Sequence, residues 1–280
     1  MIPARFEYEV AESVEHAVAL LGDREDAKLL AGGHSLLPAM KLRLVRPATL
    51  VDVGRLADLS YVREDGARIA IGALTRHKDV ASASLLREHC GIVAYTAGQV
   101  GDPQVRHRGT IGGSLAHGDP ASDLPTVVLA LDGELVARGP GGERTIAASE
   151  FFTGVFQTAL APDEMLVEVR VPKLGEASGW SYTKMSRRAQ DWATVAVAAI
   201  VERSNGSIGK ASLGLTNMGG TPLRATAAEE AIVSGASIDE ASALAADGTQ
   251  PSSDHAASAD FRRHLARVLA RRALGEAAAR

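Results

Sequence analysis

Two segments with adjacent glycines constrain the fold of this chain more than any other feature. The first, residues 31–36, directly follows an apolar run at residues 28–31 that predicts a short buried strand. The second, residues 109–114, lies inside a long stretch rich in glycine and proline. Adjacent glycines let a backbone approach its neighbours closely and can direct successive N–H groups at an anion. Either segment alone is also compatible with an ordinary turn.

Hydroxyl side chains accompany both glycine segments and favour a ligand that contains phosphate. Ser35 lies in the first segment, and Thr110 and Ser114 lie in the second. Each hydroxyl can donate a hydrogen bond to a phosphate oxygen, so the two segments together suit a pyrophosphate. The sequence has no P-loop, no G-x-G-x-x-G after a strand, no H-E-x-x-H, no C-x-x-C and no G-x-S-x-G. The common nucleotide, metalloprotease and serine hydrolase sites are therefore not expected.

The single cysteine and the charge balance exclude further classes. One cysteine in 280 residues, Cys90, cannot form an internal disulfide, a cysteine-rich zinc site or an iron–sulfur cluster. A net charge of −4 gives no electrostatic footprint for nucleic acid. The apolar run at residues 193–201 is too short for a membrane span, which takes about 20 residues. The N-terminal residues carry acidic side chains where a secretory signal is apolar, so we expect a cytoplasmic protein.

The chain divides into three parts by its pattern of elements. In residues 1–56, a helix capped by Ser13, a strand, a short helix at residues 40–44 and a strand at residues 49–53 predict a small βαβ-like unit. In residues 57–175 we expect a hairpin, two helices, and a loop at residues 101–125. Strands at residues 126–131, 134–137 and 166–171 would follow that loop.

The third part, residues 176–280, begins with strands and ends with helices. Strands are expected at residues 182–185, 195–202 and 207–215, with a turn at Asn205-Gly206 between the last two. Thr226 and Ser237 each precede a glutamate by three residues, which is the pattern of a capping box. The last helix is expected to have an apolar face with arginines on the opposite side. The apolar face comprises Phe261, Leu265, Val268 and Leu269.

Three long segments resemble a known family. Residues 31–43, AGGHSLLPAMKLR, resemble the first FAD-binding motif of the medium, flavin-binding subunit of molybdenum hydroxylases, the relatives of carbon monoxide dehydrogenase and xanthine dehydrogenase. Residues 101–125 resemble the second flavin motif of that family, and residues 182–193 resemble the start of its C-terminal domain. The resemblance covers essentially the whole chain, in the family's order.

The resemblance implies an α+β fold. Two subdomains of the FAD-binding fold of the vanillyl-alcohol oxidase type would hold FAD between them, and a C-terminal domain would contain an antiparallel sheet and helices. The implied boundaries are residues 1–56, 57–175 and 176–280. FAD is then the only cofactor expected in this chain, and no metal site is expected.

The resemblance also implies which residues contact the cofactor. The two pyrophosphate loops comprise Ala31, Gly32, Gly33, His34, Ser35, Leu36, Thr110, Ile111, Gly112, Gly113 and Ser114. Asp123 matches an acidic position suited to a ribose hydroxyl, and Leu166 matches a backbone or apolar contact. Relatives often carry asparagine at the position of Ser114, so this chain lacks the second contact that an amide makes.

Three further positions match residues around the flavin ring. Lys184 resembles a lysine near the ring, where a cation stabilises negative charge on reduced flavin. Trp192 matches an aromatic residue that covers one face, and Val100 matches a residue near the other face. The residues themselves leave alternatives open: Trp192 could pack in a core or interface, and Lys184 could be solvated. His34 and His117 are expected to hydrogen-bond near the cofactor, and the arginines of residues 262–272 to lie on a solvated or subunit-contacting face.

By the same resemblance, the chain is the flavoprotein subunit of an oxidoreductase complex. A large partner would hold the molybdenum cofactor, and a small partner would hold [2Fe–2S] clusters that supply electrons to the flavin. An external acceptor such as NAD, a quinone or oxygen would then receive them, and this chain needs no acid–base catalytic residue. The single cysteine agrees with such a division, since cluster thiolates must come from another chain. Alternatives are a stand-alone FAD-dependent oxidoreductase of the same fold and a binding module for another phosphorylated ligand.

Overall fold

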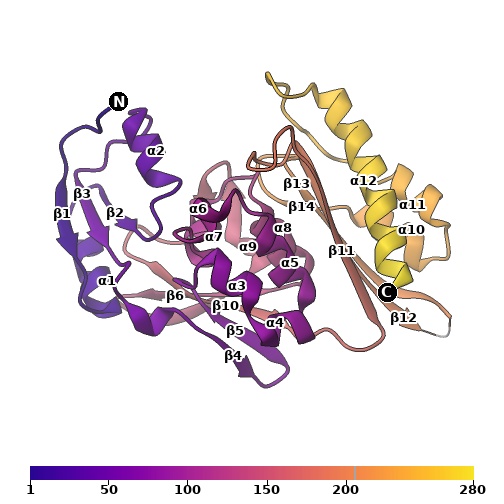
Figure 1. Ribbon diagram of the computed structural model, residues 1–280, viewed down its shortest axis with the longest axis horizontal. Coiled ribbons are helices and arrows are strands. Elements are labelled where there is room, and N and C mark those ends of the chain that lie inside the picture. Colours follow the sequence, from indigo (N-terminus) through magenta and orange to yellow (C-terminus); the bar gives the residue numbers. More distant parts are fainter. Residues whose placement is uncertain (205) are drawn as a thin grey trace.

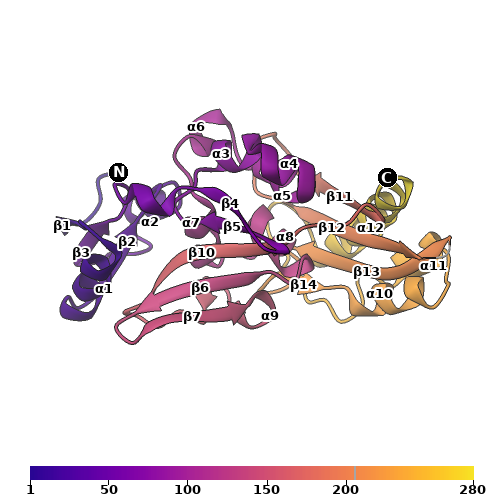
Figure 2. The same ribbon diagram turned by 90° about the horizontal axis from the view of Figure 1, so that it is seen from below.

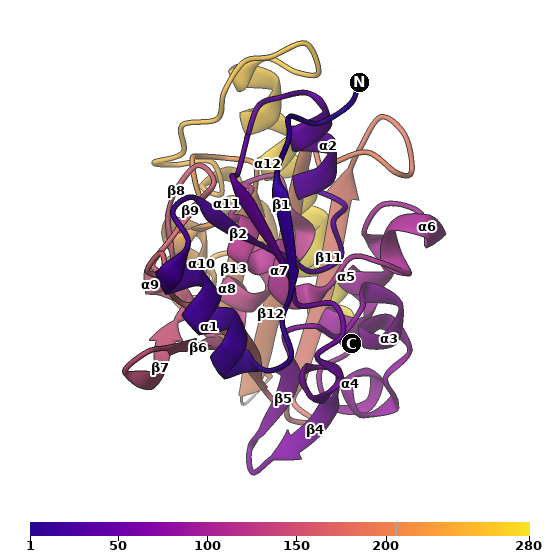
Figure 3. The same cartoon turned by 90° about the vertical axis from the view of Figure 1, so that its left-hand side faces the viewer.

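The computed structural model describes residues 1–204 and 206–280, in three units that follow one another along the long axis (Figure 1). The first unit is a parallel sheet with strand order β1-β3-β2 and two helices beside it (Figure 3). Its elements are β1 (Glu7–Val10), α1 (Val14–Asp23), β2 (Ala27–Leu30), α2 (Leu36–Lys41) and β3 (Thr49–Asp52). The predicted βαβ-like unit is confirmed and is extended by β1.

Local signals account for the two helices of the first unit. The Ser13 hydroxyl accepts a hydrogen bond from the N–H of His16 and begins α1 where the sequence predicts. The predicted helix at residues 40–44 is wrong by several positions, because α2 ends at Lys41 and Arg43 takes a positive φ of 61°. Pro38 is compatible with α2 because it lies in the first turn, where no N–H is needed.

The central unit is built on an antiparallel sheet with strand order β4-β5-β10-β6-β7 (Figure 2). The strands are β4 (Val62–Asp65), β5 (Arg68–Gly72), β6 (Glu134–Gly139), β7 (Gly142–Ala147) and β10 (Met165–Pro172). The smaller strands β8 (Phe152–Gly154) and β9 (Gln157–Thr158) pair separately. The helices are η1 (Ala57–Leu59), α3 (His77–Ser82), α4 (Ser84–His89), α5 (Gly91–Gln99), α6 (Pro103–Arg106), α7 (Ile111–His117), α8 (Asp123–Ala130) and α9 (Ala148–Phe151). Cys90 is buried between α4 and α5.

Residues 101–131 differ from the prediction. The expected loop contains α6 and α7, which Asp102 and Thr110 cap through their side chains. The expected strand at residues 126–131 is wrong, because this segment belongs to α8. Every residue of α8 is buried, since the helix lies between the central core and the C-terminal sheet. A helix buried on all sides has no polar face, so its sequence lacks the helical period that would distinguish it from a strand.

The C-terminal unit is an antiparallel sheet with strand order β11-β12-β13-β14, placed between two helical layers. Its strands are β11 (Ser178–Met185), β12 (Val195–Ser204), β13 (Ser207–Thr216) and β14 (Leu223–Arg224). Helices α5 and α8 contact one face, and α10 (Thr226–Val233), α11 (Ile238–Ala243) and α12 (Ala259–Ala279) belong to the other layer (Figure 1). The turn predicted at Asn205-Gly206 includes a residue outside the described ones.

Two predictions for the terminal helices are corrected. The capping box at Ser237 is confirmed, but Thr226 is already helical and Glu229 accepts from the N–H of Leu213 instead. The predicted apolar face of α12 is confirmed for Leu265 and Leu269, which pack on the core, but it is wrong at its start, because Phe261 is 46% exposed and Arg262 only 1%. Small alanines let α12 lie close to the sheet, and Arg262 is buried because it pairs with Asp254.

In the part of the chain that the structure describes, no helix is long and apolar enough to cross a membrane.

Candidate functional site

The two glycine segments, far apart in the sequence, lie in contact. We call residues 31–36 loop one and residues 109–114 loop two. A Cβ atom on Gly32 would lie 2.4 Å from the carbonyl oxygen of Arg108 and 2.8 Å from the Cα of Gly109. Because no side chain tolerates such distances, glycine at position 32 lets the two backbones meet. The structure therefore brings the two predicted pyrophosphate loops to one place.

Loop one, between β2 and α2, presents main-chain donors. Among the described residues, no acceptor pairs with the N–H of Gly32, Gly33, His34 or Ser35. Gly33 has a φ of 76°, a left-handed conformation that turns the chain sharply. Successive N–H groups that point out of such a turn form a concave anion site. Loop one thus has the predicted property of a phosphate-binding segment.

Loop two uses its N–H groups differently. The N–H groups of Ile111 and Gly112 donate to carbonyl oxygens just beyond β5, over 3.0 and 2.8 Å. The N–H of Gly113 donates to the hydroxyl of Thr110 over 3.1 Å. The prediction that the glycines of loop two present free N–H groups is therefore wrong, whereas the N–H of Thr110 has no partner among the described residues. Ser114 is partly exposed and makes no side-chain hydrogen bond within the described residues, so its hydroxyl is available to a ligand.

The glycine at position 112 serves packing. A Cβ atom there would lie 2.5 Å from the Cβ and 2.6 Å from the carbonyl oxygen of Ala73. The start of α7 can therefore lie directly against the end of β5, which anchors loop two to the central sheet. Gly112 thus has a structural role in close packing, as the alternative to ligand binding implies.

His77 lies beneath loop two and was not singled out by the sequence analysis. Its N–H donates to the carbonyl oxygen of Gly109 over 2.9 Å, and its ring is close enough to exclude a side chain at position 109. The ring is 3% exposed, and its Nδ1 has no hydrogen-bond partner within the described residues. Burial, with nearby Arg106 and His34, lowers the pKa of His77 from 6.5 to about 4. A lone histidine at a helix start carries no sequence signal of this support role.

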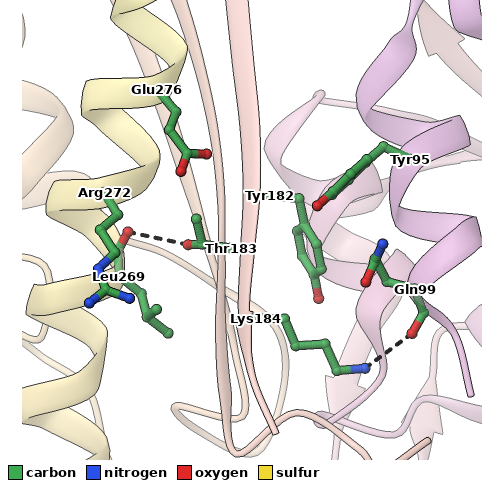
Figure 4. Close-up of a pocket in the computed structure, with 8 residues that line it drawn as sticks. All are labelled: Tyr95, Gln99, Tyr182, Thr183, Lys184, Leu269, Arg272 and Glu276. Carbon is green, nitrogen blue, oxygen red and sulfur yellow. Dashed lines mark hydrogen bonds between the residues drawn. The ribbon is translucent and has the colours of Figure 1, made fainter. Parts of the chain in front are cut away.

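A buried ion pair connects the central unit to the C-terminal sheet. The Asp123 carboxylate accepts from Lys184 Nζ over 2.9 Å and from the Tyr182 hydroxyl over 2.6 Å. Lys184 Nζ also reaches the main-chain oxygen of Gln99 at 3.4 Å (Figure 4). The Lys184 side chain is only 9% exposed, so the alternative that this lysine is solvated is wrong.

Burial governs the ionisation of the groups around this pair. It raises the pKa of the Asp123 carboxyl, and the Lys184 charge and the Tyr182 hydrogen bond oppose that rise. Burial and the neighbouring carboxylate hold the pKa of Tyr182 well above 10.0, so its hydroxyl stays a donor. The carboxylate of Asp123 is thus already engaged by two donors of this chain.

Two cavities border Gln99 at the end of α5. One, of about 260 Å³, lies along β11 between α5 and α12, and Tyr95, Tyr182 and Lys184 line part of it (Figure 4). The other, of about 280 Å³, lies between the end of α5, α6 and residues 189–190. The cation of the buried ion pair, Lys184, therefore also lines the first cavity.

Comparison with known families gives matches over nearly the whole chain. Residues 4–174 match the family model described as the FAD binding domain in molybdopterin dehydrogenase. Residues 180–277 match the model described as the CO dehydrogenase flavoprotein C-terminal domain. The chain belongs to the FAD-binding medium subunits of the molybdenum hydroxylases. The family resemblance and the α+β fold with its C-terminal antiparallel sheet are thereby confirmed.

Individual relatives align with this flavoprotein over nearly their full length. The carbon monoxide dehydrogenase medium chain of Hydrogenophaga pseudoflava is 41% identical over 285 residues, covering 100% of this chain and 99% of the relative. The xanthine dehydrogenase FAD-binding subunit of Escherichia coli O157:H7 is 30% identical, covering 97% and 96%. The solved carbon monoxide dehydrogenase from Oligotropha carboxidovorans superposes with a TM-score of 0.97 at 40% identity, covering 100% of both chains. These relatives are oxidoreductase subunits.

The residues present in this flavoprotein fit FAD. Within the described part of the chain, loop one offers unpaired N–H groups and loop two offers the Ser114 hydroxyl, and the close approach at Gly32 keeps them together. A pyrophosphate needs such converging donors, and it needs no metal ion or lysine to be held by them. No cluster of three or more His, Cys, Asp or Glu side chains that could hold a metal occurs in residues 1–204 and 206–280.

The other expected contacts occupy different environments in the flavoprotein. Val100 follows α5 and is partly buried against the central core. Leu166 is 4% exposed within β10 and belongs to that core. Trp192 is 54% exposed between β11 and β12, which contradicts core packing for this residue. His34 is exposed, and His117 packs against the ring of Phe156 with 5.0 Å between ring centroids.

Proposed function

We propose that this subunit receives electrons from [2Fe–2S] clusters of a small partner subunit and delivers them through FAD to an external acceptor. A large partner with a molybdenum cofactor would oxidise the substrate, as the names of relatives such as carbon monoxide dehydrogenase and nicotine 6-hydroxylase suggest for their own complexes. FAD supplies the exchange between electrons taken singly and electrons released in pairs. The cytoplasm is the proposed location.

The contact between loop one and loop two is the observation that carries the proposal. Loop one would bind the pyrophosphate through the N–H groups of residues 32–35, and loop two would add the hydroxyl of Ser114. Gly32 would keep both loops at one ligand, since its missing side chain allows their approach. In this assignment the remaining loop residues, Ala31, Leu36, Thr110 and Ile111, shape the site.

The flavin ring is proposed to lie near the second group of residues. Lys184 would place an ammonium beside the ring, where it favours the reduced, more negative form. Trp192, which is exposed, is free to cover one face of the ring, and Val100 would pack near the other face. The missing cluster ligands support a separate iron–sulfur partner, since the one cysteine of the chain is buried at position 90.

The test is the flavin content of the full chain, expressed with its neighbouring small and large subunits. We expect one FAD per chain by absorbance and loss of bound FAD in Gly32→Val. Gly22→Val is the matched control, because a Cβ at Gly22 meets nothing within 4 Å. Wild-type chain without flavin, or full FAD in Gly32→Val, contradicts the assignment.

The acceptor is tested separately on the purified complex. After reduction with its substrate, the complex is mixed with NAD, a quinone or oxygen, and reoxidation of the flavin is followed by absorbance. The proposal expects one of these acceptors to reoxidise it rapidly. Rapid reduction of the same acceptor by a complex that lacks this chain would contradict the proposed route.

A further inference from the structure

The buried group formed by Asp123, Lys184 and Tyr182 has a geometry that the expected ribose contact does not explain. Tyr182 and Lys184 are two residues apart on β11, so both side chains leave the same face of the strand. They meet Asp123 at the first turn of α8, with one donor on each carboxylate oxygen. Asp123 is 5% exposed and Tyr182 is 4% exposed. The carboxylate therefore faces donors of its own chain.

A lysine side chain needs such restraint if its charge is to act at one point. Its ammonium lies on a flexible four-carbon stem with several rotatable bonds. Here two acceptors restrain it, the Asp123 carboxylate at 2.9 Å and the Gln99 main-chain oxygen at 3.4 Å. The Tyr182 hydroxyl in turn holds the other carboxylate oxygen at 2.6 Å. The ammonium is thus fixed at the wall of the 260 Å³ cavity (Figure 4).

The surrounding charges make Asp123 the counter-ion of Lys184. Of the ionisable residues that line this cavity, Glu276 accepts from the Ser181 hydroxyl at 2.6 Å. Arg272, also in the lining, belongs to α12 (Figure 4). Asp123 alone forms an ion pair with Lys184 among the described residues. Removing one member of a buried pair leaves the other charge uncompensated, so the two residues should act as a unit.

We infer that Asp123 is a positioning residue, which fixes the Lys184 ammonium beside the flavin and offsets part of its charge. This inference rests on the proposed function for the location of the flavin. It assigns Asp123 an action through Lys184 that goes beyond the expected ribose contact. It also gives Tyr182 a role, since its hydroxyl orients the carboxylate.

The decisive experiment measures the flavin midpoint potential of the full chain loaded with FAD. Lys184→Met should lower the potential, because it removes a positive charge near reduced flavin. Asp123→Asn should raise the potential, because the amide oxygen can still accept from Lys184 while the compensating negative charge is gone. The double variant should keep the potential of Lys184→Met, because Asp123 acts on the flavin through the ammonium, which that variant already lacks. Lys184→Arg, which keeps the charge, should stay close to wild type.

Other outcomes overturn the inference. Shifts in the same direction for both single variants, additive shifts in the double variant, or no shift in Asp123→Asn mean that Asp123 does not act through Lys184. A residue that acts only as a ribose ligand would instead show weaker FAD binding in Asp123→Asn, with an unchanged potential and no dependence on Lys184.

A second measurement separates this inference from the proposed function. Urea unfolding of the chain without FAD tests the pair alone, and the double variant should lose less stability than the two single variants together. If Asp123 and Lys184 are coupled in the stability of the apo chain but the wild-type chain binds no FAD, the ion pair is real and the proposed function is rejected. Bound FAD without any coupling, in stability or in potential, would keep the function and reject the positioning role.

Discussion

Loop one and loop two carry the same pair of glycines, yet their main-chain N–H groups have different partners. In loop one the N–H groups of residues 32–35 have no partner among the described residues. In loop two those of residues 111–113 are all used within the chain. A Gly-Gly pair can therefore expose the backbone to a ligand or press it against a neighbouring strand. Which of these occurs depends on the segment that lies opposite.

This difference separates binding from stability. Substitutions in loop one should act mainly on the ligand, because few contacts within the chain depend on its N–H groups. Substitutions in loop two should act mainly on folding, because its glycines allow close packing against Ala73 and His77. Gly32, where the two loops meet, should show both effects.

The largest effect is expected for Gly32→Val. Its Cβ would lie 2.4 Å from the Arg108 carbonyl oxygen, and backbone atoms cannot rotate away as a flexible side chain can. The loops must separate, so we expect loss of FAD and a stability loss at or above the roughly 1–3 kcal/mol typical of overpacking. Flavin absorbance after gel filtration and urea unfolding measure the two effects. Wild-type stability in this variant would mean that the loops do not need their contact.

Gly112→Ala should lower stability before it affects the ligand. The added methyl would lie 2.5 Å from the Cβ of Ala73, at the anchor between α7 and β5. We expect a loss of about 1–3 kcal/mol in the free energy of unfolding without FAD. Gly275→Ala in α12 is the control, because its Cβ meets nothing within 4 Å. Weak FAD binding at unchanged apo stability would assign Gly112 to the ligand and break the comparison.

The sequence could predict the loops but not their partners. Glycine pairs, hydroxyls and the family resemblance identify loop one and loop two from local sequence alone. The acceptors for loop two lie just beyond β5, and the support from His77 comes from α3, so both depend on tertiary contacts. Local patterns carry no information on such contacts.

The same limit explains the errors in the fold. The sequence predicts a strand at residues 126–131 because α8 is buried on every side and lacks a polar face. It predicts a solvated Arg262 because the carboxylate that pairs with this arginine belongs to Asp254, outside the helix. By contrast, the hairpin of β4 and β5 and the capping box of Ser237 depend on neighbouring residues and are confirmed. The domain boundaries stay a prediction.

The support of loop two by His77 predicts a dependence of stability on pH. The folded chain holds the pKa of His77 at about 4 and the unfolded chain near 6.5, so between these values the unfolded state binds more protons. The contribution of neutral His77 to the free energy of unfolding is complete above pH 6.5. It falls as the pH decreases toward 4, by roughly 3 kcal/mol at most. Comparing urea unfolding of wild type and His77→Phe across this window measures it. Equal slopes in both proteins would show that His77 ionises equally well when folded.

The smallest effect, and the sharpest test of the remaining ligand role of loop two, is expected for Ser114→Ala. The Ser114 hydroxyl bonds to nothing else among the described residues, so apo stability should not change. The free energy of FAD binding should weaken by the value of about one hydrogen bond, roughly 0.5–1.5 kcal/mol. Thr110→Val is the counterpart, since loss of its cap to Gly113 should cost about 1 kcal/mol of stability. Titration with FAD and urea unfolding of both variants should thus give opposite patterns. If Ser114→Ala leaves FAD affinity unchanged, the Ser114 hydroxyl is no donor to the ligand, and the main role of loop two is to hold loop one in place.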